Sequence, residues 1–359
     1  MPCPRHFLHG ASLAAILALS VAGCSTAAAP PTPTGHGFIE GAVEATEPQL
    51  HLAAIDVDGA LTLLDLIEGD SAVIAELGEV DAASTDGRFV FAARDGALTV
   101  VDTGAWTVPH GDHSHYYLAE PRVVGTVAGD GTPGVTPGSA ITAVRFDDET
   151  VLLDTAALGD GTLVETREHR SDLAAAIGDR PLLAADGFVG DTVCTEPAGT
   201  ISTVVGTVIG CAEGALLATE DAPLELIPYP AAGRATSFEA RKDRPTVAAL
   251  VDGGVWLLDT RERSWTVLAT EPLAQVVAVD DAAERVVALS IDGRVLTLDP
   301  ATGATLASTE PLGSGTLTVD ANRAYLNAAA AVSEIDYRDS VRIARSFDLD
   351  AAFLLETGR

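Results

Sequence analysis

A short phrase recurs along the chain: a glycine turn, a run of alternating apolar residues, and an acidic residue that ends it. The four clear copies are residues 59–65, 96–102, 253–259 and 293–299, and three weaker copies are residues 148–154, 214–220 and 330–336. The first two clear copies begin 37 residues apart and the last two 40 residues apart, which is the period of a four-stranded propeller blade. Alternation with a period of two, bounded by Asp-Gly turns, is typical of strands joined in hairpins. The phrase therefore predicts an all-β fold.

The period favours one closed ring over other all-β architectures. A single blade cannot bury both of its faces, whereas a ring of blades buries a continuous core and leaves only short edges. Seven copies predict a single β-propeller of seven blades over residues 41–359. Two spacings, 102–148 and 154–214, are too long, so an eighth, degenerate blade is the alternative. A pair of β-sandwiches would not explain the period. The best helix candidate, residues 171–177, amounts to one or two short turns.

The first 23 residues have the composition of a lipoprotein signal peptide, which must be set aside before fold reasoning. The uncharged apolar run at 11–22 is shorter than the roughly 20 residues of a membrane-spanning helix. It leads directly into Ala22, Gly23 and Cys24, which match a bacterial lipobox. We expect a lipid on Cys24 that anchors the protein to the extracytoplasmic face of the cell membrane. The alternative is an ordinary signal peptide cleaved a few residues later.

The remaining cysteines and the segment after the signal fit an exported protein. Residues 24–40 are rich in proline, alanine and threonine, which predicts an extended, semi-rigid linker. The folded body then retains only Cys194 and Cys211. A single even pair outside the cytoplasm is most simply a disulfide. Two thiolates on a metal ion are the alternative, although no histidine lies between them or immediately beside them.

The charge of the chain excludes several kinds of partner. The formal net charge is -31, and Lys242 is the only lysine. Nucleic acid and anionic lipid both require a basic surface, so membrane contact is expected through the lipid anchor alone. The carboxylates are spread along the sequence and form no Asp-x-Asp-x-Asp-Gly calcium loop. The acidity is therefore interpreted as a source of solubility.

Three of the eight histidines fall within residues 110–115, which read His-Gly-Asp-His-Ser-His. Residues 104–108 are expected to pair back onto the strand at 96–102, and Pro109 to end that pairing because it lacks an N–H. The histidine segment would then lie on a loop at the end of a strand, where binding residues are common in rigid folds.

This composition predicts a metal site. His113 and His115 are two residues apart, so both imidazoles point to the same side of an extended segment. His110 and Asp112 can fold back through Gly111 and supply further ligands, and Zn²⁺ takes four such donors in a tetrahedron. His169, expected on the next blade, is a further candidate ligand. The alternative is that the histidines are only polar surface.

No sequence motif points to catalysis. Gly-x-Ser-x-Gly and the phosphate-binding P-loop are both absent, and no Ser/His/Asp set is indicated by local sequence. We therefore expect a protein that is not an enzyme. A lactonase- or lyase-like site built from scattered residues in the central channel is the alternative.

The histidine segment continues into Tyr116 and Tyr117, and Gly210 precedes the second cysteine of the pair. Together with the repeats, these features resemble the AztD family of zinc metallochaperones. The resemblance implies an extracytoplasmic propeller that binds zinc and passes it to the substrate-binding protein of an ABC zinc importer. It covers most of the body, and its most specific part is residues 110–117. Family members have further histidines where this chain has residues 198–199 and 171–172, so the resemblance implies a divergent member with an incomplete inner zinc site.

The sequence thus predicts a monomeric, membrane-tethered metallochaperone that carries Zn²⁺ on its histidine-rich segment. The alternative function is a metal-independent propeller lipoprotein that binds a protein or glycan partner in the cell envelope.

Overall fold

The computed structural model describes residues 37–328 and 330–359. The predicted signal peptide, the lipidation site Cys24 and most of the predicted linker lie outside the described residues. Residues 39–359 form one compact unit. Within the described part of the chain, no helix has the length and apolarity needed to cross a membrane.

Antiparallel sheets make up almost all of this unit. The four-stranded sheets of its N-terminal half have the orders β34 (Phe353–Thr357), β2 (His51–Ile55), β3 (Ala60–Asp65), β4 (Ser71–Glu76); β10 (Arg122–Ala128), β7 (Ala97–Asp102), β6 (Phe89–Arg94), β5 (Ala82–Thr85); β11 (Gly134–Thr136), β12 (Ile141–Arg145), β13 (Glu149–Asp154), β14 (Glu165–His169); and β15 (Leu173–Ile177), β16 (Arg180–Ala185), β17 (Phe188–Val189), β18 (Thr192–Val193).

The remaining sheets complete the series. They are β19 (Ala198–Ser202), β20 (Thr207–Gly210), β21 (Gly214–Ala218), β22 (Glu225–Pro228); β23 (Thr246–Val251), β24 (Gly254–Asp259), β25 (Ser264–Leu268); β26 (Leu273–Ala278), β27 (Val286–Ser290), β28 (Val295–Leu298), β29 (Thr305–Ser308); and β30 (Thr316–Val319), β31 (Ala324–Ala328), β32 (Ala331–Asp336), β33 (Arg342–Phe347). A last three-stranded sheet consists of β1 (Val43–Ala45), β9 (His113–Leu118) and β8 (Ala105–His110).

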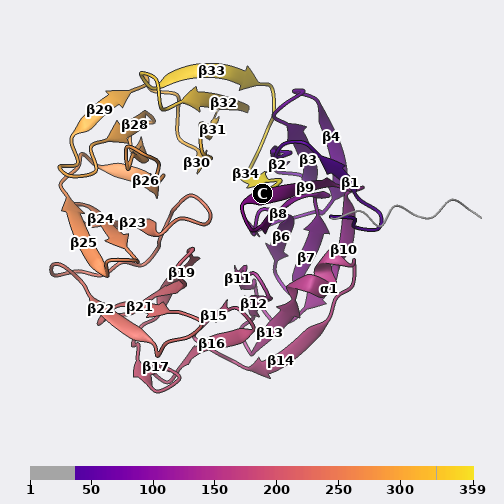
Figure 1. Cartoon of the computed structure of the whole chain (residues 1–359), viewed down its shortest axis with the longest axis horizontal. Helices are drawn as coiled ribbons and strands as arrows, with labels where there is room; N and C mark the ends of the chain where they lie inside the picture. Colours follow the sequence, from indigo (N-terminus) through magenta and orange to yellow (C-terminus); the bar gives the residue numbers. More distant parts are fainter. Residues whose placement is uncertain (1–36, 329) are drawn as a thin grey trace, which may run out of the picture. The chain divides into compact units, whose positions relative to one another are not determined.

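The large sheets follow one another around a ring, as Figure 1 shows. Neighbouring sheets pack face to face, because both faces of their middle strands are apolar. Phe89 and Phe91 of β6, for example, share one buried cluster with Val144 and Phe146 of the next sheet. The ring closes where the last strand joins the first sheet: β34 pairs with β2 in the register that sets Thr357 opposite His51.

The predicted all-β propeller is confirmed. Each copy of the recurring phrase contains a strand, namely β3, β7, β13, β21, β24, β28 and β32. A further four-stranded sheet, β15 to β18, lies in the long spacing between residues 154 and 214, and its third strand has only two residues. The number of blades, seven with eight as the alternative, stays a prediction.

The predicted helix is corrected by the structure, and the predicted disulfide is confirmed. The helix candidate at 171–177 is wrong, because Leu173–Ile177 is strand β15, whose three alanines are buried. The α-helix of the described residues is α1 (Thr155–Gly159), which Asp154 caps by accepting a hydrogen bond from the Ala157 N–H. The predicted disulfide between Cys194 and Cys211 is confirmed, and it links the sheet β15 to β18 with the sheet β19 to β22.

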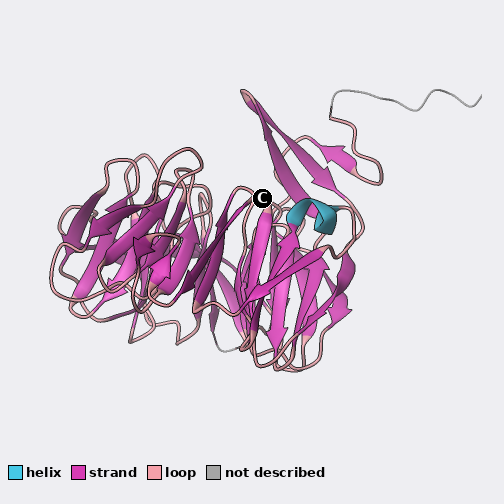
Figure 2. Cartoon of the chain, turned by 90° about the horizontal axis from the view of Figure 1, so that it is seen from below, coloured by secondary structure: helices cyan, strands magenta, loops and turns pink. Residues whose placement is uncertain are grey.

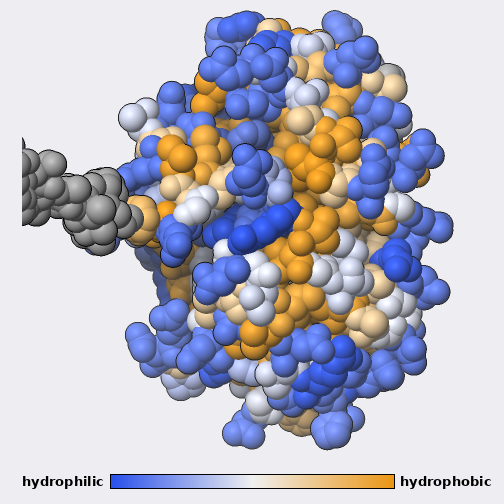
Figure 3. All heavy atoms as spheres, turned by 90° about the vertical axis from the view of Figure 1, so that its right-hand side faces the viewer, coloured by the Kyte–Doolittle hydropathy of each residue, from blue (hydrophilic) through white to orange (hydrophobic). Residues whose placement is uncertain are grey.

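The histidine segment lies in the additional sheet, not on a loop of the ring. The prediction that residues 104–108 pair back onto β7 is wrong, because β10 occupies that edge of β7; β8, which begins at Ala105, pairs with β9 instead. Figure 2 shows the two as a long strand pair that projects beside the helix. The side of the molecule that Figure 3 shows mixes apolar and polar side chains. Strands β1, β4 and β10 contain the exposed apolar residues Val43, Val73 and Val123.

Candidate metal centre

The three clustered histidines lie on a tight β-hairpin. Its turn consists of Gly111 and Asp112 alone, with His110 paired directly to His113. Gly111 has φ +60° and Asp112 has a negative φ, the pattern of a type II′ turn, which requires glycine at its first central position. The prediction that this segment is a loop is therefore wrong.

Pro109 is compatible with the hairpin, which explains why it did not end the pairing. In a hairpin closed by a two-residue turn, the closing pair exchanges hydrogen bonds, and the next pair does not. Pro109 belongs to that next pair, opposite Ser114, on the edge strand of the sheet. Its missing N–H would point away from β9, so no hydrogen bond of the ladder is lost.

Strand register brings the three imidazoles to one face. His110 is opposite His113, and His115 follows two residues later on the same side of β9. One nitrogen of each ring can be chosen so that all three lie within 4.8 Å of one another. The ring centroids of His113 and His115 are 4.9 Å apart, and those of His110 and His113 are 5.1 Å apart. His110 and His113 are exposed, whereas His115 is buried.

Two carboxylates contact the Nδ1 atoms of two of these rings. Oε1 of Glu44, on β1, lies 2.6 Å from Nδ1 of His115, and Oδ1 of Asp112 lies 3.1 Å from Nδ1 of His113. A carboxylate on Nδ1 favours the tautomer that carries its proton there, which leaves the Nε2 lone pair for a metal ion. Both contacts therefore preset their imidazoles as ligands.

An aromatic stack supports the base of the cluster. The ring of Tyr117 stacks on His115 at 6.2 Å and on Trp106 at 5.2 Å between centroids. The guanidinium of Arg88, the residue just before β6, lies 3.8 Å from the centroid of Trp106 and makes two hydrogen bonds to buried Asp102. Burial and the charge of Glu44 raise the pKa of Tyr117, so the phenol stays neutral. The stack fixes the orientation of His115 relative to the ring of sheets.

The geometry fits a tetrahedral transition metal. Imidazole nitrogens that bind Zn²⁺ at about 2.0 Å lie roughly 3.3 Å from one another, so the nitrogens need to approach by about 1.5 Å at most. Side-chain rotations at exposed His110 and His113 supply such a shift, because neither ring is packed in a core. Imidazole donors suit Zn²⁺, Cu²⁺ and Ni²⁺ better than Mg²⁺ or Ca²⁺, which prefer oxygen ligands.

The other predicted ligands lie elsewhere. The side chain of Asp112 is fully exposed and is not in the cluster; its ligand role stays a prediction. His169 is exposed on β14 opposite Glu149, in a sheet of the ring, and it does not join the three histidines. Glu44 was missed by sequence reasoning, because it enters the site only through the register of β1 opposite Tyr117. Nothing in the local sequence around Glu44 indicates that pairing.

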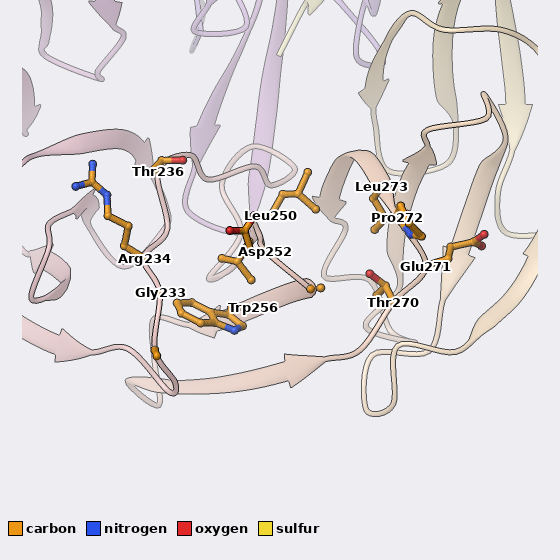
Figure 4. Close-up of a pocket in the computed structure, with 14 residues that line it drawn as sticks. Gly233, Arg234, Thr236, Leu250, Asp252, Trp256, Thr270, Glu271, Pro272 and Leu273 are labelled. Carbon is orange, nitrogen blue, oxygen red and sulfur yellow. The ribbon is translucent and has the colours of Figure 1, made fainter.

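A pocket lies between the sheets of β23 and β26, away from the hairpin. This pocket has a volume of about 730 Å³, and residues 232–236, 250–254 and 270–273 contribute to its lining, together with Trp256 (Figure 4). Its charged side chains include Arg234, which is paired with Glu196, and Glu271, which is paired with Arg294. It contains no histidine or cysteine. Among the described residues, the group of side chains that could hold a metal ion is therefore the three histidines of the hairpin.

Fold and site together define a β-propeller that carries a three-histidine hairpin. No protein-family model matches the chain, and no curated protein does. Among solved structures, apo AztD from Citrobacter koseri superposes with a TM-score of 0.72 at 17% identity, over 88% of this chain and 98% of that one, and a second structure of the same protein gives the same values. Hsv2 from Kluyvelomyces marxianus has a TM-score of 0.51 at 7% identity, over 84% of this chain and 95% of that one. The predicted AztD-type fold is thus confirmed.

Proposed function

We propose that this protein binds Zn²⁺ on the β8–β9 hairpin through His110, His113 and His115. The observation that carries the proposal is the convergence of three imidazole nitrogens within 4.8 Å on one face of the hairpin. Surface histidines without a shared role have no reason to converge in this way, nor to have a carboxylate on the Nδ1 atom of two of the rings. The AztD-type fold supports zinc over copper or nickel.

The bound zinc is cargo that passes to the substrate-binding protein of an ABC zinc importer. Two of the three histidines are exposed, so an acceptor can replace the ligands one at a time. The protein acts outside the cytoplasm, in keeping with its disulfide, and a lipid on Cys24 holds it at the membrane. It functions as a monomer and is not an enzyme.

Zinc titration of chelator-stripped protein tests the binding step. We expect the wild type to bind Zn²⁺ more tightly than about 1 µM, and the double variant His113→Ala, His115→Ala to lose most of that affinity. His169→Ala is the matched control, because it removes one exposed histidine of another sheet. A wild type that binds only above micromolar concentrations, or a double variant with unchanged affinity, would overturn the proposal.

Transfer requires a second assay. Zinc-loaded protein is mixed with the metal-free substrate-binding protein of a zinc importer, with chelator present to capture any released ion. We expect zinc to reach the acceptor faster than it reaches the chelator. If the protein carries no zinc when purified from its native envelope, the alternative of a metal-independent propeller that binds a protein or glycan is favoured.

A further inference from the structure

Arg241 holds an unusual position beside the middle of the ring. It follows a two-residue bridge in which Glu239 pairs with Ala248 of β23 and Ala240 pairs with Ala278 of β26. The Arg241 N–H then donates to the carbonyl oxygen of Ala278 at 2.9 Å. Strands β23 and β26 are the first strands of their sheets and face the middle of the ring in Figure 1. The backbone of Arg241 is thus held at the inner edge of two sheets.

The side chain of Arg241 is mostly buried and forms no ion pair with the described residues. The residue is 7% exposed, and its Nε is enclosed without any hydrogen-bond acceptor. Within residues 37–328 and 330–359, no carboxylate lies within ion-pair distance of this guanidinium, although the chain has 52 acidic residues against 21 basic ones. A buried, unpaired charge is strongly unfavourable, and native structures rarely leave such a group without a protein partner, water or ion.

Further cations surround Arg241. Burial lowers its pKa, and the charges of Arg244 and Arg359 lower it further. Lys242, the next residue, donates from its Nζ to the Arg359 backbone oxygen at 3.4 Å. Segment 241–244 reads Arg-Lys-Asp-Arg, so three of the chain's 21 basic residues stand within four positions. The cations therefore gather at one place in a strongly acidic protein.

The nearby acidic groups are committed to other partners. Asp280 accepts a hydrogen bond from the Thr246 hydroxyl at 3.2 Å, and Glu356 lies 2.6 Å from Nη2 of Arg359. The hydroxyl of Tyr337 donates to the Asp320 carbonyl oxygen at 2.9 Å. The charge of Asp280 partly offsets the lowering of the Arg241 pKa, but none of these contacts supplies the Arg241 guanidinium with a hydrogen-bond acceptor.

We propose that Arg241, with Arg244 and Arg359, binds a small oxyanion at the inner edge of the ring. The planar fork of a guanidinium matches a carboxylate or phosphate group through two parallel hydrogen bonds, which a halide cannot reproduce. The ligand class is therefore a small molecule that carries a carboxylate or phosphate. This site is separate from the hairpin and uses no residue of the proposed zinc site.

Anion titration of the full chain tests the proposal. Inorganic phosphate and acetate serve as probes, each against sodium chloride at equal ionic strength, with binding followed by calorimetry and by the thermal unfolding midpoint. We expect a saturable response to at least one oxyanion in the wild type. Non-specific salt effects on the midpoint rise without saturation and are shared by every variant.

Variants then locate the site. Arg241→Met should abolish the saturable response, and Arg244→Met, at an exposed position, should weaken the affinity on the order of tenfold through loss of one charge-assisted contact. The control is Arg294→Met, because Arg294 is paired with Asp292 and Glu271. Zinc affinity should be equal in all four proteins. The absence of a saturable response in the wild type would overturn the proposal. Equal oxyanion affinity in the wild type and Arg244→Met would do the same, and this variant decides the matter if Arg241→Met does not fold.

Discussion

Glu44 illustrates how one residue outside the histidine segment can control the site. Its carboxylate lies 2.6 Å from Nδ1 of His115 and so presets the ring for metal binding through Nε2. We expect Glu44→Gln to lower zinc affinity by roughly 10- to 100-fold, the usual effect of losing such a partner. Competition with a zinc chelator of known affinity measures the change. Glu47→Gln is the control, since Glu47 is an exposed carboxylate of the same segment; an equal effect of both changes would contradict the role given to Glu44.

At the residue scale, the sequence located the histidines but not their surroundings. Spacing alone predicted that His113 and His115 share one side, because alternation is a local property of extended backbone. Glu44 lies 71 residues from His115 along the chain. Its contact depends on the pairing of β1 with β9, which local pattern does not encode. The same holds for Arg88, which reaches Trp106 from another sheet.

At the scale of elements, the recurring phrase predicted strands correctly, whereas Pro109 predicted the end of a strand incorrectly. Every copy of the phrase contains a strand, because apolar alternation and a glycine turn act locally. Pro109 was expected to end the pairing, yet it occupies a position where its missing N–H has no strand to bond. The sheet β15 to β18 escaped a clear prediction since β17 has only two residues, too few for a visible alternation.

The hairpin turn gives a prediction for this element. Gly111 has φ +60°, and no other atom lies within 4 Å of the position that a Cβ would take there. An alanine at this position would therefore suffer from backbone strain and not from a clash. We expect Gly111→Ala to destabilise the hairpin by about 1 to 3 kcal/mol and to lower zinc affinity several-fold, because His110 and His113 pair across this turn. Zinc titration and hydrogen exchange of the hairpin amides measure the two effects.

Gly69 offers a matched control for this change. It also has a positive φ, +82°, with open space at its Cβ, and it lies between β3 and β4 of the ring. Gly69→Ala should carry a similar conformational cost and leave zinc affinity unchanged. If Gly111→Ala binds zinc as well as Gly69→Ala does, the turn does not control the geometry of the histidines.

At the scale of the whole molecule, ring closure rests on β34, the strand that returns to the first sheet. Glu356 of this strand lies opposite Leu52 of β2 and contacts Arg359. Burial raises the pKa of Glu356 to about 7, and the charge of Asp320 adds to this, while Arg359 opposes it. The carboxyl group is only 9% exposed. The closing strand therefore contains a carboxyl group that holds its proton up to neutral pH.

This shift makes the stability of the ring depend on pH. The unfolded chain loses the Glu356 proton near the ordinary pKa of 4.5, whereas the folded protein keeps it to about pH 7. Between these values the folded state binds more protons, so the free energy of unfolding falls as pH rises, by about 3 kcal/mol across the window. Glu356→Gln removes this pH dependence. As pH rises from 5 to 8, we expect the free energy of unfolding of the variant to increase by about 3 kcal/mol relative to that of the wild type. Urea denaturation across this range measures it, with exposed Glu310→Gln as control; parallel profiles for Glu356→Gln and the wild type would show that the closing strand carries no such proton.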